Sequence, residues 1–170
     1  MTYKCLFLDR DGVINIDYGY VYKKKDFVFR EEIFCICEEA KLLNFKIIVI
    51  TNQAGIGRGL YTERDFIIVN NYMIEKFANK GIKIDAVYFC PFHPTKGKGM
   101  YMKKSFDRKP YPGLILKAEK EHGINLKNSI MIGDKKTDEK AAENAGIKFY
   151  VDANKYNWKE QSIKILRSLI

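Results

Sequence analysis

The chain has 170 residues, of which 46% are hydrophobic and 30% are charged, as is ordinary for one soluble domain with a buried core. No apolar run approaches the roughly 20 residues of a membrane span, and the N-terminus lacks a signal-peptide layout. The formal net charge of +9 suits an anionic partner such as a nucleic acid, a charged surface or a small anionic substrate. Because the lysines are spread out, solvated surface is the better explanation for most of them.

The four cysteines show no disulfide framework. Cys5 lies in a predicted strand, and Cys35 and Cys37 lie two apart on a predicted helix, so they point to different sides. Cys90 lies just after another predicted strand. We therefore expect a reducing, cytoplasmic environment.

Apolar strands alternate with amphipathic helices along the chain. The pattern predicts strands over residues 4–9, 46–51, 85–89, 129–132 and 148–151. It predicts helices over residues 31–44, from 62 onward, 112–122, 137–146 and 158–169. Thr62 and Asp65 form a capping-box pattern, Pro112 suits a first helical turn, and Thr137 is expected to cap its helix. This alternation predicts an α/β fold: a Rossmann-like, doubly wound parallel sheet with helices on both faces, in one domain spanning residues 1–170.

Polar residues stand at the ends of three predicted strands. Asp9 ends the first strand, Thr51 ends the second, and Asp134 follows the fourth. Ligands of such sheets bind at the carboxyl ends of the strands, so we expect these residues to converge. Lys109, just before a predicted helix, could reach the same edge.

The residues at this edge suit phosphoryl transfer. Asp9, Asp11 and Asp134 offer hard oxygen ligands for Mg²⁺, which would offset the repulsion between the carboxylates. A phosphate also needs cations and donors, which Lys109, Thr51 and backbone N–H groups of the turn after Asp11 could supply. One aspartate could attack phosphorus while the other transfers protons. The spacing alone leaves open which of the two attacks.

Four segments together resemble the haloacid dehalogenase (HAD) superfamily of phosphatases, and they occur in that superfamily's order: FLDRDGVIN, VITNQAGIGRG, RKPYPG and MIGDKKTDEKAAENAG. The resemblance implies that Asp9 is the nucleophile and Asp11 the general acid and base. It implies that Thr51 and Lys109 contact the phosphoryl group. Each segment alone could be a turn or a helix cap, so the ordered set carries the interpretation.

The same resemblance implies a Mg²⁺ site. Its ligands would be Asp9, the backbone carbonyl of Asp11, and Asp134, with Lys135 adjacent and Asp138 orienting the site. Superfamily members often carry a cap domain, but the segments between these motifs are too short for one. We therefore expect a capless HAD fold in which loops determine specificity.

Four loop segments, DYGYV, TNQAGIGRG, CPFHP and RKPYPG, narrow the match. They resemble the D-glycero-D-manno-heptose 1,7-bisphosphate 7-phosphatases, a branch of the histidinol-phosphatase-like subfamily. This implies hydrolysis of the C7 phosphate through an aspartyl-phosphate, in nucleotide-activated heptose biosynthesis for lipopolysaccharide or capsule. The implied substrate contacts are Asp17, Tyr18, Gly19, Tyr20, Asn52, Gln53, Ala54 and Arg108. Arg108 could bind the phosphate that is not cleaved through a bidentate contact. Ala54 stands where this branch commonly has Ser.

Other functions compete with this one. Histidinol phosphate is an alternative substrate for the same chemistry. The charge and the missing cap would suit a nucleic-acid 3′-phosphatase, but the chain has no recognisable nucleic-acid module. The intact pair Asp9 and Asp11 argues against a non-catalytic phosphate-binding domain. We expect a small sugar bisphosphate as partner, no nucleic acid, no membrane, and a monomer. Both C1 anomers, and so an ADP- or a GDP-heptose route, are compatible with the sequence.

The loop before Arg108 departs from the resemblance. Relatives often hold structural zinc there with a Cys-x-His pair and a Cys-x-Cys pair. Here residues 90–93 read CPFH, which shifts the histidine by one position, and residues 105–107 read SFD, which lack both cysteines. We therefore expect no zinc. Packing onto the body is expected to order the loop instead, through Met100, Tyr101, Met102 and Phe106.

Overall fold

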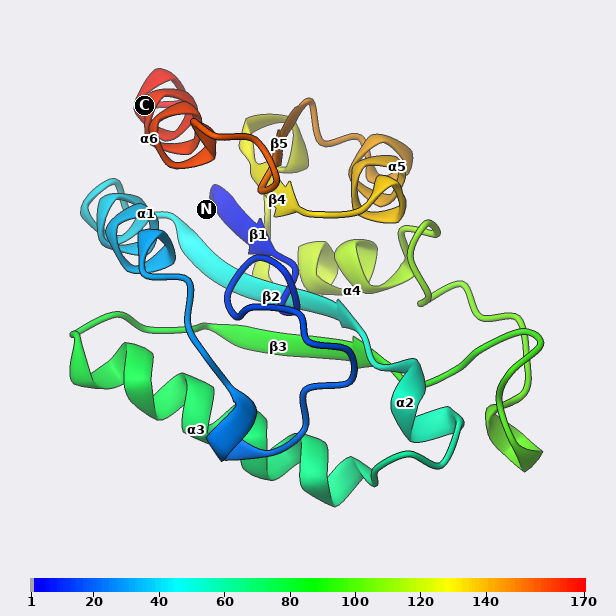
Figure 1. Ribbon diagram of the computed structural model, residues 1–170. Coiled ribbons are helices and arrows are strands. Elements are labelled where there is room, and N and C mark those ends of the chain that lie inside the picture. Colours follow the sequence, from blue (N-terminus) through cyan, green and yellow to red (C-terminus); the bar gives the residue numbers. More distant parts are fainter. Residues whose placement is uncertain (1) are drawn as a thin grey trace.

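A five-stranded parallel sheet forms the centre of the computed structural model, which describes residues 2–170 (Figure 1). The strands are β1 (Cys5–Leu8), β2 (Lys46–Asn52), β3 (Ala86–Cys90), β4 (Ile130–Gly133) and β5 (Phe149–Asp152). They lie in the order β3-β2-β1-β4-β5, and every neighbouring pair is parallel. The predicted α/β class is confirmed, and each strand begins and ends within one residue of its predicted bounds.

Helices cover both faces of the sheet. They are α1 (Glu32–Leu42), α2 (Ala54–Gly57), α3 (Glu63–Asn79), α4 (Gly113–His122), α5 (Lys136–Ala145) and α6 (Trp158–Ser168). The connections among residues 2–170 also contain short 3₁₀ helices, namely η1 (Lys24–Asp26), η2 (Gly99–Tyr101) and η3 (Leu126–Asn128). Helices α1, α3 and α6 pack on one face, while α4 and α5 pack on the other (Figure 1). The doubly wound arrangement is therefore confirmed.

The side chains of β1 explain why the sheet is covered twice. Leu6 and Leu8 join the core on the side of α1, α3 and α6, whereas Cys5 and Phe7 join the core on the side of α4 and α5. Successive strand residues point to opposite faces, and here both sets are apolar. Both faces must then be buried, which is the usual state of a parallel sheet.

Two predictions about helix starts had different outcomes. The capping box is confirmed, because Oγ1 of Thr62 accepts the N–H of Asp65 and the Asp65 carboxylate accepts the N–H of Thr62. The prediction that Thr137 caps its helix is wrong, because α5 begins at Lys136. Oδ2 of Asp138 accepts the N–H groups of Asp134 and Lys135, at 3.2 and 3.0 Å. A carboxylate inside the first turn therefore holds the backbone N–H groups that lead into the helix.

The loop between β3 and α4 differs from its predicted packing. Met100, Met102 and Phe106 are 78%, 55% and 60% exposed, so the prediction that they pack onto the body is wrong. Tyr101 does pack onto the body, against the buried cluster of Ile56, Tyr61 and Phe66. Backbone hydrogen bonds hold the loop instead, including one of 2.7 Å from the N–H of Lys98 to Gly57 O and one of 3.1 Å from the N–H of His93 to Tyr101 O. Such bonds fix the backbone without requiring its apolar side chains to turn inward.

Helix α2 was not predicted, because four residues are too few to show a helical period.

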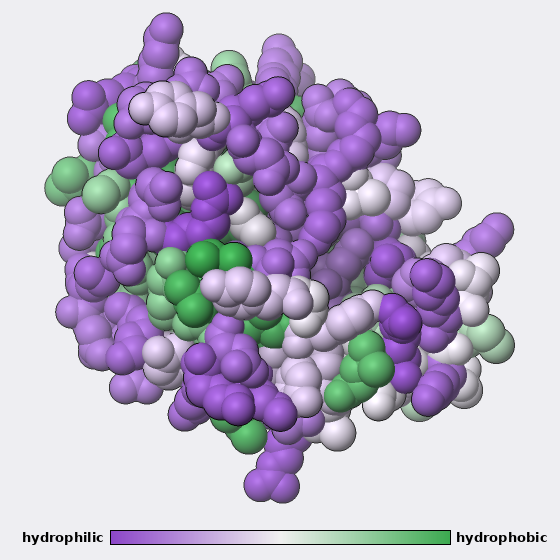
Figure 2. All heavy atoms as spheres, in the orientation of Figure 1, coloured by the Kyte–Doolittle hydropathy of each residue, from purple (hydrophilic) through white to green (hydrophobic). Residues whose placement is uncertain are grey.

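Across residues 2–170, no helix combines the length and apolar character of a membrane span. On the face drawn in Figure 2, hydrophilic side chains predominate and hydrophobic atoms form small separate groups. The chain between Asp11 and Thr51 contains η1, α1 and β2, and the assignment of residues 1–170 to one domain stays a prediction.

Candidate active site

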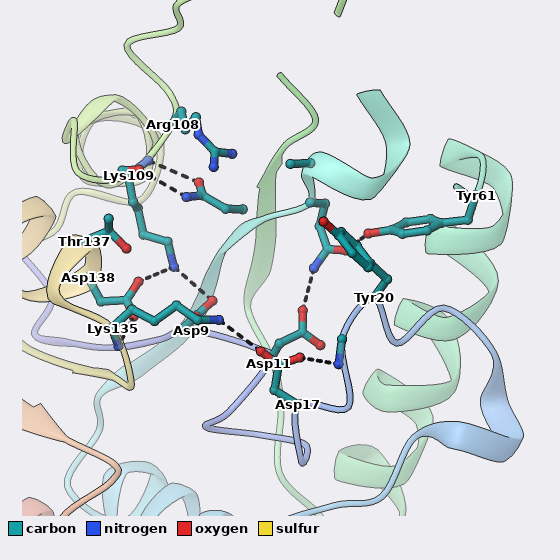
Figure 3. A pocket seen from close by; sticks show the side chains of 14 residues that line it. Asp9, Asp11, Asp17, Tyr20, Tyr61, Arg108, Lys109, Lys135, Thr137 and Asp138 are labelled. Carbon is teal, nitrogen blue, oxygen red and sulfur yellow. Dashed lines mark hydrogen bonds and ion pairs between the residues drawn. The ribbon is translucent and has the colours of Figure 1, made fainter. Parts of the chain in front are cut away.

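A pocket of about 460 Å³ lies at the carboxyl ends of the central strands (Figure 3). It is lined by Asp9, Asp11, Asp17, Gly19, Tyr20, Asn52, Gln53, Ala54, Tyr61, Arg108, Lys109, Lys135, Thr137 and Asp138. Segments far apart in the chain supply these residues, including the turn after β1, the end of β2, the segment before α4 and the start of α5. The structure thus brings most of the sequence-predicted site residues together.

A buried lysine bridges two carboxylates in this pocket. Nζ of Lys109 lies 2.9 Å from Oδ1 of Asp9 and 2.7 Å from Oδ1 of Asp138. Nζ also donates to Ile50 O at 2.8 Å. Asn52 holds the same lysine by its backbone, because its side-chain amide exchanges two hydrogen bonds of 3.1 Å with the N–H and C=O of Lys109. The end of β2 therefore fixes where the ammonium group lies.

Burial and the neighbouring charges shift the pKa values of Asp9 and Lys109 in opposite directions. Burial raises the pKa of Asp9 to about 7, although the Lys109 ammonium acts to lower it. Burial alone would lower the pKa of Lys109, but the neighbouring carboxylates of Asp9 and Asp138 outweigh it, and the pKa is raised. The pocket therefore keeps a permanent cation beside Asp9.

Asp11 lies in a different environment from Asp9. The guanidinium of the fully buried Arg10 donates to both Asp11 oxygens through Nη2, at 2.8 and 2.9 Å. Asn15 Nδ2 donates to Oδ1 at 3.1 Å, and Gln53 Nε2 donates to Oδ2 at 2.9 Å. Three side chains therefore fix the Asp11 carboxylate, and none of them belongs to the group around Lys109.

A group of three carboxylates could hold a cation. Oxygens of Asp9, Asp134 and Asp138 all lie within 4.8 Å of one another. Oδ1 of Asp134 is buried and has no hydrogen-bond partner among residues 2–170. Gly12, with φ +88°, leaves space for this side chain, since a Cβ there would come within 2.3 Å of Asp134 Oδ2. Hard oxygens with an unused buried acceptor fit Mg²⁺.

The predicted specificity loop, residues 17–20, bends over the pocket. Asp17 forms an ion pair of 3.0 Å with Lys135 and accepts the N–H of Gly19 at 2.9 Å. Positive φ angles at Gly19 (80°) and Tyr20 (56°) turn the backbone. The Tyr20 hydroxyl accepts a hydrogen bond from Arg58, whose guanidinium also lies over the Tyr20 ring. The loop is thus tied to Lys135 at the start of α5 and to Arg58 at the end of α2.

Some predicted residues lie outside the pocket lining. Tyr18 is 64% exposed, Thr51 is fully buried beneath the lining, and Asp134 lines an adjacent pocket. Sequence reasoning missed Tyr61 and interpreted Thr137 only as a helix cap. Tyr61 carries no motif, and the position of Thr137 three residues after Asp134 was the one available signal.

Comparisons with other proteins support the resemblance. The model of the HAD-hydrolase-like family matches residues 106–154. The chain is 49% identical over 147 residues to a D-glycero-alpha-D-manno-heptose-1,7-bisphosphate 7-phosphatase of Burkholderia mallei, covering 86% of this chain and 78% of the relative. It is 48% identical over 148 residues to a D-glycero-beta-D-manno-heptose-1,7-bisphosphate 7-phosphatase of Helicobacter pylori, covering 86% and 82%.

Solved structures agree with these relatives. A HAD-like phosphatase of Mesorhizobium loti superposes with a TM-score of 0.90 at 27% identity, covering 99% of this chain and 88% of that one. The D,D-heptose 1,7-bisphosphate phosphatase of B. bronchiseptica, solved with magnesium and phosphate, superposes with a TM-score of 0.75 at 27% identity, covering 84% and 76%. The chain therefore belongs to the heptose-1,7-bisphosphate 7-phosphatase family of HAD-like hydrolases.

Proposed function

We propose that this protein is a Mg²⁺-dependent phosphatase that removes the C7 phosphate of D-glycero-D-manno-heptose 1,7-bisphosphate. The observation that carries the proposal is the buried set of Asp9, Lys109 and Asp138 beside a separately held Asp11, in a chain of this family. The released heptose 1-phosphate would then be available for nucleotide activation, on the route to lipopolysaccharide or capsule.

In the first step, a carboxylate oxygen of Asp9 attacks phosphorus. The bond between phosphorus and the C7 oxygen breaks, and Asp11 gives its proton to that oxygen. Lys109 and Thr51 bind the phosphoryl oxygens and stabilise the charge that spreads over them. The step leaves an aspartyl-phosphate at Asp9 and a deprotonated Asp11.

In the second step, Asp11 takes a proton from water, and the water oxygen attacks the same phosphorus. The bond to Asp9 breaks, which releases inorganic phosphate and restores both carboxyl groups. Separate groups hold the two aspartates, Lys109 beside Asp9 and Arg10, Asn15 and Gln53 around Asp11, so each carboxyl group keeps its position while the other reacts.

Mg²⁺ would be held by Asp9, the backbone carbonyl of Asp11, and Asp134. Bound there, it would offset negative charge on the phosphate and the carboxylates. Asp138 supports this arrangement as a positioning residue, because its oxygens already engage Lys109 and the N–H groups that precede α5.

The second phosphate of the substrate would bind Arg108. This half-exposed guanidinium lines the pocket, and Nη1 donates to Phe92 O at 3.1 Å, which fixes its direction. Asp17, Tyr18, Gly19, Tyr20, Asn52, Gln53 and Ala54 would complete the substrate contacts. Tyr18 would have to turn inward when the sugar binds, because the side chain is exposed here.

A substrate panel tests the proposal. Phosphate release would be compared as kcat/KM for both C1 anomers of heptose 1,7-bisphosphate, histidinol phosphate and a 3′-phosphorylated oligonucleotide, with Mg²⁺ and with EDTA. We expect a heptose bisphosphate to be preferred and EDTA to abolish release. Preference for histidinol phosphate or the oligonucleotide, or full activity in EDTA, would contradict the proposal.

A further inference from the structure

We propose that Tyr61 is a positioning residue for proton transfer: through the side-chain amide of Gln53, it holds the carboxylate of Asp11 in place. The inference rests on the proposed function, which gives Asp11 the role of acid and base. Tyr61 lies at the end of the loop before α3, eight residues beyond Gln53, and its side chain reaches into the pocket (Figure 3).

A short chain of hydrogen bonds joins Tyr61, through Gln53, to Asp11 and Thr51. The Tyr61 hydroxyl donates to Oε1 of Gln53. Nε2 of the same amide donates to Oδ2 of Asp11 and to Oγ1 of Thr51, at 2.9 Å each. The NH₂ group of Gln53 thus links Asp11, the proposed acid and base, to Thr51, a proposed phosphoryl contact. Tyr61 holds the carbonyl oxygen of the same amide.

Hydrogen-bonding capacity fixes the direction of this chain. Both Asp11 oxygens accept hydrogen bonds from Arg10 in this structure, as in the deprotonated form that begins the second step. A deprotonated carboxylate only accepts, so Gln53 must present its NH₂ group to Asp11. Its carbonyl oxygen then necessarily faces Tyr61, whose hydroxyl must donate. Gln53 is 1% exposed and Tyr61 is 6% exposed, so water is poorly placed to replace either group. Loss of the hydroxyl would leave Oε1 of Gln53 buried without its donor, which favours rotation of the amide away from Asp11.

The surroundings of Tyr61 keep its ring in one place. Tyr22 stacks on it, with ring centroids 5.0 Å apart and planes 6° apart. Gly55 leaves space for it, because a Cβ at that position would come within 2.1 Å of the Tyr61 ring and 2.8 Å of Tyr20. A residue held this firmly can define the position of the next group in the chain.

A role of Tyr61 in positioning Asp11 would affect only those substrates whose leaving oxygen must be protonated. If Tyr61 positions Asp11, its hydroxyl should matter most when the leaving oxygen is strongly basic and must be protonated as it departs. It should matter little when the leaving group is stable as an anion. A purely structural role or a general binding role would slow all substrates alike.

A series of para-substituted phenyl phosphates provides the test, because their shapes are similar while the basicity of the leaving phenol changes. For each protein, log kcat/KM would be plotted against the pKa of the leaving phenol, with thermal melting as a check of folding. We expect Asp11→Asn to steepen the negative slope strongly. We expect Tyr61→Phe to steepen it in the same sense, with a loss of about five- to tenfold on the most basic leaving group, the size of one lost hydrogen bond.

Two further variants sharpen the test. Tyr22→Phe removes a hydroxyl from the ring stacked on Tyr61 without touching the amide, so its slope should match that of the unaltered protein. Tyr61→Phe should add no further loss when it is made in the Asp11→Asn protein, because the group that it positions is already absent.

The outcomes separate this inference from the proposed function. An unchanged slope for Tyr61→Phe, or a uniform loss across the series, overturns the role of Tyr61 while a steep slope for Asp11→Asn leaves the proposed chemistry standing. A further loss from Tyr61→Phe in the Asp11→Asn protein also overturns it. If Asp11→Asn itself leaves the slope unchanged, proton transfer by Asp11 is wrong, and the role of Tyr61 is wrong with it.

Discussion

Lys109 and Asp138 form an ion pair of 2.7 Å in which the side chains are 2% and 1% exposed. The pair joins the start of α5 to the segment before α4, and the same ammonium group reaches Asp9 at 2.9 Å. Removing one partner of a buried ion pair leaves an uncompensated charge, which costs more than the pair contributes when intact. The pair therefore links the stability of the fold to the proposed chemistry.

Replacement of Lys109 by methionine should destabilise the protein. Asp9 and Asp138 would both lose their cation, so we expect the free energy of unfolding to fall by about 3–5 kcal/mol. Urea denaturation in EDTA measures the change. Lys46→Met is the control, because Lys46 is partly exposed and lies 3.6 Å from Asp85 at the other end of the sheet; its loss should stay within about 1 kcal/mol. Equal losses in the two variants would contradict the prediction.

Asp9→Asn should abolish turnover while the protein remains folded. The amide keeps the shape of the side chain but lacks the attacking oxygen charge. Phosphate release should fall to background, and circular dichroism should be unchanged. Asp85→Asn makes the same chemical change far from the pocket and should retain activity. Turnover of Asp9→Asn within about tenfold of the unaltered protein would show that Asp9 is not the nucleophile.

Asp11→Asn should slow turnover by roughly 10²–10⁴-fold, the usual contribution of general acid–base catalysis. Attack by Asp9 would still be possible, so the covalent phosphoryl group should be found on Asp9 when the reaction is quenched and the protein digested. Mass spectrometry locates it. A phosphoryl group on Asp11 would reverse the two assignments.

The loss of activity in Arg108→Ala should depend on how many phosphates the substrate carries. We expect kcat/KM to fall far more for heptose 1,7-bisphosphate than for heptose 7-phosphate, because only the former offers a second phosphate to the guanidinium. Arg64→Ala, which removes an exposed arginine of α3, should affect neither substrate. Equal losses on both substrates would assign Arg108 to the reacting phosphate or to the fold.

Protein purified without chelators should contain far less than one zinc per chain. Nδ1 of His93 accepts the N–H groups of Thr95 and Lys96, at 3.3 and 3.0 Å, and so already serves the loop as a hydrogen-bond acceptor. Elemental analysis by plasma mass spectrometry gives the metal content. About one zinc per chain, lost in Cys90→Ala, would show that the loop does hold a structural metal.

The sequence by itself determined the elements and the centre of the site. Five apolar strands spaced by helical patterns indicate a parallel sheet, and a parallel sheet places its carboxyl ends along one edge. Asp9 and Thr51 could therefore be placed together from the sequence, although 42 positions separate them. The order of strands and helices along the chain was enough to place these two residues at one edge of the sheet, and no side-chain contact was needed.

The tertiary structure decided which side chains support those residues. Tyr61 reaches Gln53, and Asp138 reaches Lys109, across loops whose paths no local pattern encodes. The exposed loop residues Met100 and Phe106 were predicted wrongly for the same reason, since backbone bonds to other segments fix that loop. Periodicity and spacing report which face of an element is apolar, whereas hydrogen bonds between distant segments depend on where the whole chain comes together in space.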